Sequence, residues 1–311
     1  MTSRFGTALT ALIALTVPAS GAMSQEERCA DRPRLCETIR RKLGADALVA
    51  RKPNPPATAT LRYGADPRQA LDFWRSDTPL RKGPLLVFVH GGGWTRGDKA
   101  TATGPDKIAA FTARGYGVAS INYRMPPTVG VEREPKDVAA AILFLRMRAA
   151  ELGFDPDRIV LMGHSAGAHL AALVATDATY LGKALPAIRA VVLLDGAGYD
   201  LMRERDDTGL VAARIYERAF GKLSESERAR LSPVRHAALP NAGAFLIVHD
   251  ADRADAVQQG VALEQALRDG GTTVQRAPIG NTSHMQLNWN VGLPGDAETA
   301  EIMAFLEREG L

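Results

Sequence analysis

Ser165 has the sequence surroundings of an activated nucleophile. It is the central residue of Gly163-His164-Ser165-Ala166-Gly167, a G-x-S-x-G motif. The apolar run at residues 159–162 predicts a buried strand before the motif, and the small and apolar residues 168–175 predict a helix after it. A sharp turn between strand and helix exposes the serine Oγ, and the helix N-terminus favours negative charge. The sequence therefore predicts a nucleophilic serine, with the backbone N–H of Ala166 directed at an oxyanion.

A nucleophilic serine needs a general base, and the sequence predicts His284 for this role. When the nucleophile lies in such a turn, the chain order of the triad is serine, acid, histidine. Of the six histidines, His284 alone follows the last predicted strand, in the loop at residues 280–284. The other five flank the serine, precede it or precede the acid candidates: His90, His164, His169, His236 and His249.

Three aspartates beyond the predicted strand 244–248 are candidates for the acid that orients the base. They are Asp250, Asp252 and Asp255. A triad acid lies in the loop just past a strand end, where it accepts a hydrogen bond from Nδ1 of the histidine. Asp250 is so close to the strand that its side chain can point into the sheet. Position alone leaves Asp252 and Asp255 open.

A run of three glycines follows another predicted strand. The apolar residues 85–89 lead into His90-Gly91-Gly92-Gly93-Trp94. Consecutive glycines let the backbone fold so that successive N–H groups converge, which is how an oxyanion hole is built from main chain alone. A phosphate-binding loop would continue as Gly-Lys-Ser/Thr into a helix, and this sequence does not. The loop therefore predicts oxyanion donors.

The remaining elements alternate between strand and helix along the chain. Fully apolar runs are typical of strands covered on both faces, and the alternation predicts parallel strands joined by right-handed crossovers. We expect short surface helices at residues 199–240, inserted over the carboxyl edge of the sheet, and a turn at Asp155-Pro156-Asp157. The predicted strands are residues 61–64, 69–74, 85–89, 117–122, 159–162, 190–194, 244–248 and 274–277. The predicted helices are residues 99–114, 136–150, 168–175, 261–267 and 297–308.

The composition is that of an ordinary globular protein. The 311 residues carry a net charge of only +3, with 46% hydrophobic and 23% charged residues. Lysine and arginine are scattered, so nothing indicates a nucleic-acid partner. The length suffices for one or two domains with a sizeable core.

Residues 1–22 predict a signal peptide. Arg4 supplies the positive charge, and the apolar run at 5–17 is too short to span a bilayer. Small residues at 18–22 allow cleavage after Ala22, with Ser24 as the second choice. We therefore expect an exported protein, periplasmic or secreted, with no stable membrane association after cleavage. The alternatives are an N-terminal helix of the fold or an uncleaved anchor.

Residues 23–60 predict a connector that contains the two cysteines of the chain, Cys29 and Cys36. In an oxidising compartment two cysteines this close should form a disulfide, which would stabilise the connector by roughly 2–3 kcal/mol at most. A pair of free thiols is the alternative. Two thiols with no histidine nearby are too few ligands for a metal site.

Several motifs in this order resemble the α/β-hydrolase carboxylesterases, in the branch near hormone-sensitive lipase and kynurenine formamidase. The resemblance extends from about Tyr63 to the C-terminus, and its motifs are YGADPRQALDFW, HGGGW with GGGWTRGDK, INYR, GHSAGAHL and NTSHM. It implies an α/β-hydrolase fold over residues 61–311 and no cofactor or metal. It also implies Ser165 as nucleophile, His284 as base, and N–H donors at Gly92, Gly93 and Ala166.

The resemblance also favours Asp252 as the acid, because its spacing matches the family when Gln259 is taken as the usual helix glutamine. Asp255 is the alternative. The family often has a glycine in this strand-end turn, whereas the turn here is His249-Asp250-Ala251-Asp252.

These observations predict a serine carboxylesterase that acts through an acyl-enzyme on small esters or esters of short or medium acyl chains. The charged runs 203–207 and 225–230 in the insertion do not form the apolar lid that a lipase acting on long-chain triglycerides needs. The alternatives are an amidase of the arylformamidase type and a non-catalytic binding member of the fold. The expected partner is a small-molecule ester, and the sequence does not indicate an oligomeric state.

Overall fold

The protein was analysed as a computed structural model, which describes residues 52–311 except 79–81, 204–208 and 239. One compact unit comprises Pro53–Leu311. The predicted signal peptide and both cysteines lie outside the described residues. Within the described part, none of the helices is long and apolar enough to cross a membrane.

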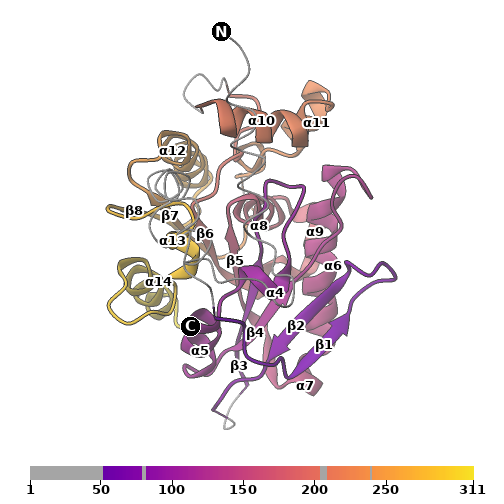
Figure 1. Cartoon of the computed structure of the whole chain (residues 1–311), viewed down its shortest axis with the longest axis vertical. Helices are drawn as coiled ribbons and strands as arrows, with labels where there is room; N and C mark the ends of the chain where they lie inside the picture. The colour runs from indigo at the N-terminus through magenta and orange to yellow at the C-terminus, as the bar shows by residue number, and fades with distance from the viewer. Residues whose placement is uncertain (1–51, 79–81, 204–208, 239) are drawn as a thin grey trace, which may run out of the picture. The chain divides into compact units, whose positions relative to one another are not determined.

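The described residues form an eight-stranded sheet in the order β1-β2-β4-β3-β5-β6-β7-β8 (Figure 1). β1 and β2 pair antiparallel, and β2 also pairs antiparallel with β4, whereas every other neighbouring pair is parallel. The predicted, mostly parallel sheet is therefore confirmed. The strands are β1 (Ala59–Arg62), β2 (Ala70–Trp74), β3 (Gly83–Val89), β4 (Gly117–Ile121), β5 (Phe154–His164), β6 (Ile188–Leu194), β7 (Ala244–Asp250) and β8 (Val274–Ile279).

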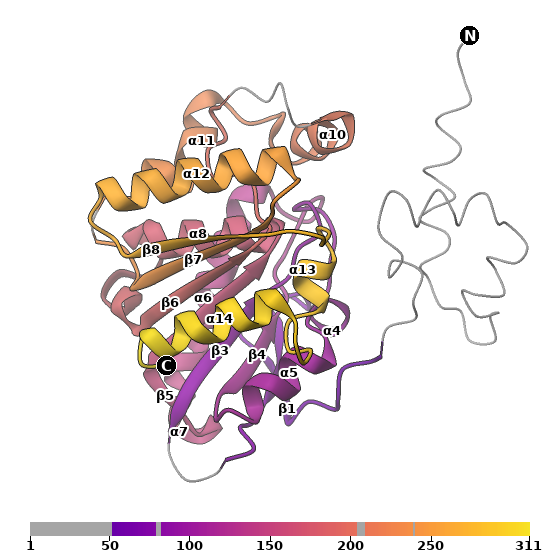
Figure 2. The ribbon, with the colours of Figure 1, turned by 90° about the vertical axis from the view of Figure 1, so that its left-hand side faces the viewer.

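Helices cover both faces of the sheet, as Figures 1 and 2 show. Alternate residues of each buried strand face opposite sides, so Leu85, Val87 and Val89 join one apolar core while Leu86 and Phe88 join the other. The first core is covered by α6 (Glu134–Met147), α8 (Ala166–Thr176) and α12 (Ala254–Asp269). The second is covered by α5 (Pro105–Thr112), α13 (Gln286–Trp289) and α14 (Ala297–Arg308).

Two predicted elements differ in extent from the sequence expectation. The helix expected at 99–114 is divided into α4 (Lys99–Ala102) and α5, because Gly104 adopts a φ of 88° and Pro105 begins a new helix. β5 begins at Phe154, so Asp155-Pro156-Asp157 belongs to the strand and not to the expected turn. Its extra length follows from pairing with the start of β3 at Gly83.

The insertion between β6 and β7 contains α10 (Gly209–Phe220) and α11 (Glu225–Arg230). Both helices lie at the top of the unit in Figures 1 and 2. α10 has an apolar side on which Tyr216 and Phe220 are buried. Its charges lie on the opposite side, the usual pattern of a helix that packs on a core.

Candidate active site

Ser165 occupies a strained turn between β5 and α8, as its motif predicted. Its backbone φ of 57° lies in the left-handed region, which costs a residue other than glycine. The turn is tight: a Cβ on Gly163 would lie 2.2 Å from the carbonyl oxygen of Gly167. The N–H of Ser165 donates to Leu194 O at 2.9 Å, which ties the turn to the end of β6. The serine is half-buried at the carboxyl edge of the sheet.

His284 is paired with Asp195. Nδ1 of His284 lies 2.6 Å from Oδ2 of Asp195, a residue with no exposed surface that follows β6 directly. Burial raises the pKa of Asp195, but the hydrogen bond from His284 and the positive charge of Arg253 outweigh burial and hold it well below its ordinary value. The carboxylate is therefore ionised and accepts from Nδ1–H, which leaves Nε2 of His284 free to accept a proton.

The structure corrects the expected partner of His284. The Asp252 side chain is exposed, and the Asp252 N–H donates to Asp250 Oδ1 at 2.9 Å. Asp255, the alternative, pairs with Arg253 at 2.9 Å. Within the described residues neither carboxylate bonds to His284. The reason is that β7 continues to Asp250 and α12 begins at Ala254, so the short connection directs Arg253 at the histidine.

Sequence reasoning passed over Asp195 although the sequence contained a signal for it. Asp195 ends the apolar run of β6, and Gly196 follows it. β6 also pairs in parallel with β5, the strand that carries the serine. Asp195 adopts a φ of 44°, so it shares a strained backbone with Ser165. Such strain persists only where the surrounding structure fixes it, and both residues lie at the carboxyl ends of neighbouring strands.

The glycine loop lies against the nucleophile. A Cβ on Gly91 would lie 2.9 Å from Cβ of Ser165, so no larger residue fits there without a shift. Gly92 and Gly93 adopt φ values of 134° and 61°, which favour glycine. Among the described residues the N–H groups of Gly92, Gly93 and Ala166 donate to no protein acceptor. These three N–H groups, which the sequence predicted as oxyanion donors, belong to the glycine loop and to the first residue of α8.

Trp94 anchors the end of this loop. Its Nε1–H donates to Nδ1 of His169 at 3.1 Å, and Nε2–H of His169 donates to Leu231 O at 2.7 Å. Burial lowers the pKa of His169 to about 4, so the ring stays neutral and keeps this tautomer. His169 on α8 is therefore a structural link between the glycine loop and the insertion.

α10 packs over the glycine loop. The ring of Trp94 lies 4.7 Å from that of Phe220 and 5.4 Å from that of Tyr216. A Cβ on Gly93 would lie 2.9 Å from Cγ2 of Ile215. This side of the site is consequently walled by apolar groups of α10.

His164 holds the backbone of the histidine loop. Its Nε2 lies 2.8 Å from the carbonyl oxygen of His284, and the two rings are 4.7 Å apart. Burial lowers the pKa of His164 well below its ordinary value, and the neighbouring His284 adds to this effect. A neutral ring can donate from Nε2 to the carbonyl, so His164 fixes where His284 stands relative to Ser165.

Lys107 supports α13, which follows the same loop. Its ammonium group is fully buried, donates to Asn288 Oδ1 at 2.5 Å and lies 3.9 Å from the centre of the Phe88 ring. Burial lowers the pKa of Lys107 well below its ordinary value. The amide of Asn288 in turn donates to Ala102 O at 2.8 Å, so the segment after His284 is tied to α4.

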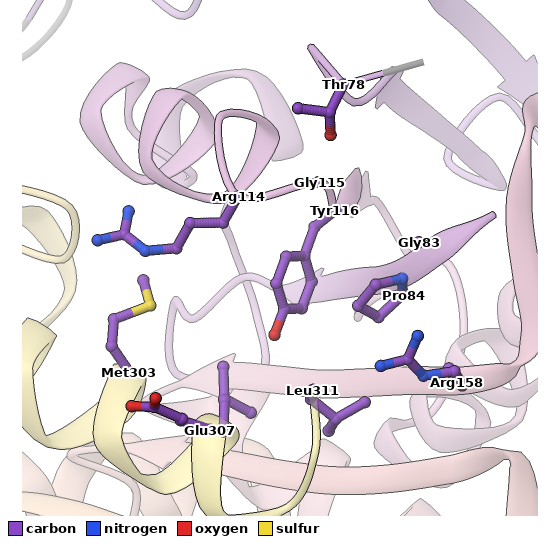
Figure 3. Close-up of a pocket in the computed structure, with 11 residues that line it drawn as sticks. Thr78, Gly83, Pro84, Arg114, Gly115, Tyr116, Arg158, Met303, Glu307 and Leu311 are labelled. Carbon is purple, nitrogen blue, oxygen red and sulfur yellow. The ribbon is translucent and has the colours of Figure 1, made fainter. Parts of the chain in front are cut away.

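A cavity of about 590 Å³ lies at the opposite edge of the sheet (Figure 3). Gly83 and Tyr116, at the amino ends of β3 and β4, line it together with Arg114, Arg158 and Leu311. It is far along the strands from Ser165, which follows the carboxyl end of β5, and it is not part of the site. Within the described residues no three histidine, cysteine or acidic side chains are grouped to hold a metal ion.

Comparison with protein families gives one match over most of the unit. The BD-FAE family model matches residues 71–267. Esterase LipC of Mycobacterium tuberculosis is 32% identical over 180 residues, which are 53% of this chain and 44% of the relative. The carboxylic ester hydrolase LipN of the same organism is 31% identical over 248 residues, 72% of this chain and 62% of the relative. A probable isoprenylcysteine alpha-carbonyl methylesterase of Arabidopsis thaliana is 39% identical over 119 residues, 38% of this chain and 25% of the relative. The chain thus spans between a quarter and two thirds of the length of these relatives.

Solved structures are similar over the whole unit. A truncated carbohydrate esterase from gut microbiota superposes with a TM-score of 0.67 at 21% identity, over 83% of this chain and 99% of that one. An esterase of Thermogutta terrifontis with bound butyrate gives a TM-score of 0.62 at 22% identity, over 81% and 93%. At this level of identity the similarity shows the α/β-hydrolase fold.

Proposed function

Because the chain belongs to the BD-FAE family, we propose that it is a serine carboxylic-ester hydrolase. The observation that carries the proposal is the pairing of His284 with the buried Asp195, 2.6 Å apart, beside a serine held in a strained turn. This arrangement supplies the three groups that ester hydrolysis requires: a nucleophile, a base that takes its proton and an acid that orients the base. The named esterases among the relatives support the same reaction class.

In the proposed mechanism Ser165 Oγ attacks the ester carbonyl carbon while Nε2 of His284 takes its proton. Asp195 accepts the hydrogen bond from Nδ1 and stabilises the imidazolium that forms. The N–H groups of Gly92, Gly93 and Ala166 stabilise the oxyanion of the tetrahedral intermediate. The C–O bond to the alcohol breaks as His284 returns the proton to the leaving oxygen.

The acyl-enzyme is then hydrolysed by the same groups. His284 takes a proton from water, whose oxygen attacks the acyl carbon, and the proton passes to Ser165 Oγ as the acid leaves. Among the described residues no hydrogen bond joins Ser165 Oγ to His284. In free enzymes such contacts are often long and tighten only in the complex with substrate.

The proposed substrates are small esters or esters of short or medium acyl chains. Ile215 and Tyr216 of α10 support this, because their side chains pack against Gly93 and Trp94 of the glycine loop and limit the space on that side. The test is kcat/KM for p-nitrophenyl esters from acetate to palmitate, with aryl formamides and acetylated sugars in the same panel. A maximum at palmitate, or formamides preferred over every ester, would contradict this assignment.

Export is proposed from the sequence alone. The proposed signal peptide ends at Ala22, and the mature chain would carry a Cys29–Cys36 disulfide. The intact mass of periplasmic material measures both features. A retained Met1, or two thiols that alkylate without reductant, would contradict them.

A further inference from the structure

Arg253 contacts His284 where the sequence predicted that an aspartate of the same connection would do so. It lies in the connection from β7 to α12, and its Nη1 lies 2.7 Å from Nδ1 of His284. The same nitrogen donates to Asp195 twice, to the backbone oxygen at 2.8 Å and to Oδ2 at 2.5 Å. A cation therefore touches both members of the acid–base pair.

Asp255 holds the other side of the guanidinium. Nε and Nη2 of Arg253 donate to Oδ1 and Oδ2 of Asp255, both at 2.9 Å. A two-point pairing of this kind fixes the plane of the guanidinium as well as its position. Asp255 is buried at the start of α12, so the clamp is attached to the fold and not to a free loop.

Asp195 needs this cation because its carboxylate has no exposed surface. A buried charge is costly unless it is paired and hydrogen-bonded. Three donors meet the carboxylate: Nη1 of Arg253 and Nδ1 of His284 at Oδ2, and the N–H of Asp250 at Oδ1. Of these, only Arg253 brings a permanent charge.

The positions of Nη1 and Nδ1 suggest what the two hydrogen bonds from Arg253 to Asp255, here called the clamp, prevent. Nη1 and Nδ1 are 2.7 Å apart and share Oδ2 as acceptor. If Nη1 turned from Asp195 to donate to Nδ1, the hydrogen of the imidazole would have to sit on Nε2. His284 could then no longer accept a proton from Ser165, since Nε2 would already carry one. The two hydrogen bonds to Asp255 hold the guanidinium of Arg253 and oppose this rotation.

We propose that Arg253, clamped by Asp255, is a positioning residue that fixes the Asp195 carboxylate against Nδ1 of His284. The proposal rests on the function proposed above and assigns a role to a side chain that does not touch the reacting atoms. The other titratable groups around the pair come from several elements: Asp250 of β7, Tyr199 beyond β6, His164 of β5 and, behind His164, Lys107 of α5.

The test is the pH profile of kcat/KM for a short-chain p-nitrophenyl ester with Arg253→Gln. Asp195 and His284 share a hydrogen bond and take up protons as a pair. Loss of a positive charge that contacts both groups favours proton uptake by the pair, so activity should disappear at higher pH on the acid side. We expect the acid midpoint to move up by about one unit or more, with a fall of at least tenfold at neutral pH. Arg253→Lys, which keeps the charge but not the two-point clamp, should recover part of the shift.

The chain offers a matched control in Arg276 of β8. Arg276 pairs with Glu264 of α12 at 2.8 Å and lies 3.1 Å from Nε2 of His249, so it also joins a carboxylate and a histidine. Its side chain is 28% exposed, against 25% for Arg253. Arg276→Gln should leave the acid midpoint where it is.

Asp255→Asn keeps the cation but weakens the clamp, and it should move the midpoint upward by less than Arg253→Gln. If Arg253→Gln does not fold, Arg253→Lys and Asp255→Asn carry the test. An unmoved acid midpoint in folded variants, even with a lower plateau, would overturn the proposal, because a merely structural role lowers the rate at all pH values. Failure of the esterase proposal would look different: Ser165→Ala would then retain the activity.

Discussion

The two halves of the active site are built in different ways. Ser165 and Ala166 lie on one turn, and the glycine loop that faces them follows the neighbouring strand β3. The base and acid come instead from beyond β8 and β6, and Arg253, which touches both, comes from beyond β7. The nucleophile half depends on local backbone geometry, whereas the acid–base half depends on how three strand ends are placed side by side. The first half requires glycine where the backbone approaches closely, as at Gly91 and Gly163, whereas the second half could draw its acid from more than one strand.

The largest expected effect is that of Ser165→Ala. Removal of the nucleophile should lower kcat by roughly 10⁴–10⁶-fold, because the remaining groups can only polarise the ester. Ester hydrolysis by the purified variant measures this, with circular dichroism to establish that it folds. Turnover like that of the wild type would refute the proposed mechanism.

Asp195→Asn and Asp252→Asn test which aspartate orients His284. Asp195→Asn should lower kcat by about 10⁴-fold, because an amide favours the wrong histidine tautomer. Asp252→Asn should change kcat by less than threefold, since its side chain is exposed and bonds to no part of His284 among the described residues. The ratio of the two rates decides the matter, and a greater loss in Asp252→Asn would restore the assignment made from sequence.

Gly91→Ala tests the local character of the nucleophile half. The added methyl would lie 2.9 Å from Cβ of Ser165 and 2.7 Å from the carbonyl oxygen of His164, so the glycine loop must shift. A displaced oxyanion hole should cost about 10²–10³-fold in kcat with a small change in KM. Gly104→Ala serves as the control for added bulk, because its Cβ would meet nothing within 4 Å, although its φ of 88° is also unfavourable. Equal effects of the two variants would contradict the proposed role of the loop.

His164→Ala tests the hydrogen bond that connects the two halves. Without the donor at Nε2, the carbonyl of His284 loses its partner and the base is held less firmly. We expect kcat to fall about tenfold, because misplacement of a catalytic group is costly even when the chemistry is intact. His236→Ala, whose ring bonds to a surface carbonyl at Arg230, is the matched control and should leave kcat unchanged. A kcat equal to that of the wild type in folded His164→Ala would show that the contact is dispensable.

The secondary structure was largely predictable because each buried strand is a short apolar run between turn residues. All eight strands of the described part were expected, although their ends moved by up to several residues. β5 was the extreme case, since only its apolar half was visible in the sequence and its first residues are strand because Gly83 of β3 pairs with Phe154. The break between α4 and α5 was also predictable from Gly104-Pro105, but the sequence analysis predicted one continuous helix across it.

The sequence by itself determined the nucleophile turn and the glycine loop. Both depend on backbone conformations and close approaches that only particular residues at fixed spacing allow, so the motif is enough to predict the local geometry. The choice of acid was different. Asp195, Asp252 and Asp255 all follow strands that end at one edge of the sheet, and no local rule says which carboxylate meets His284. Tertiary structure decided it through distance: the short connection after β7 brings Arg253 to the histidine, and the buried end of β6 brings Asp195 within 2.6 Å of Nδ1.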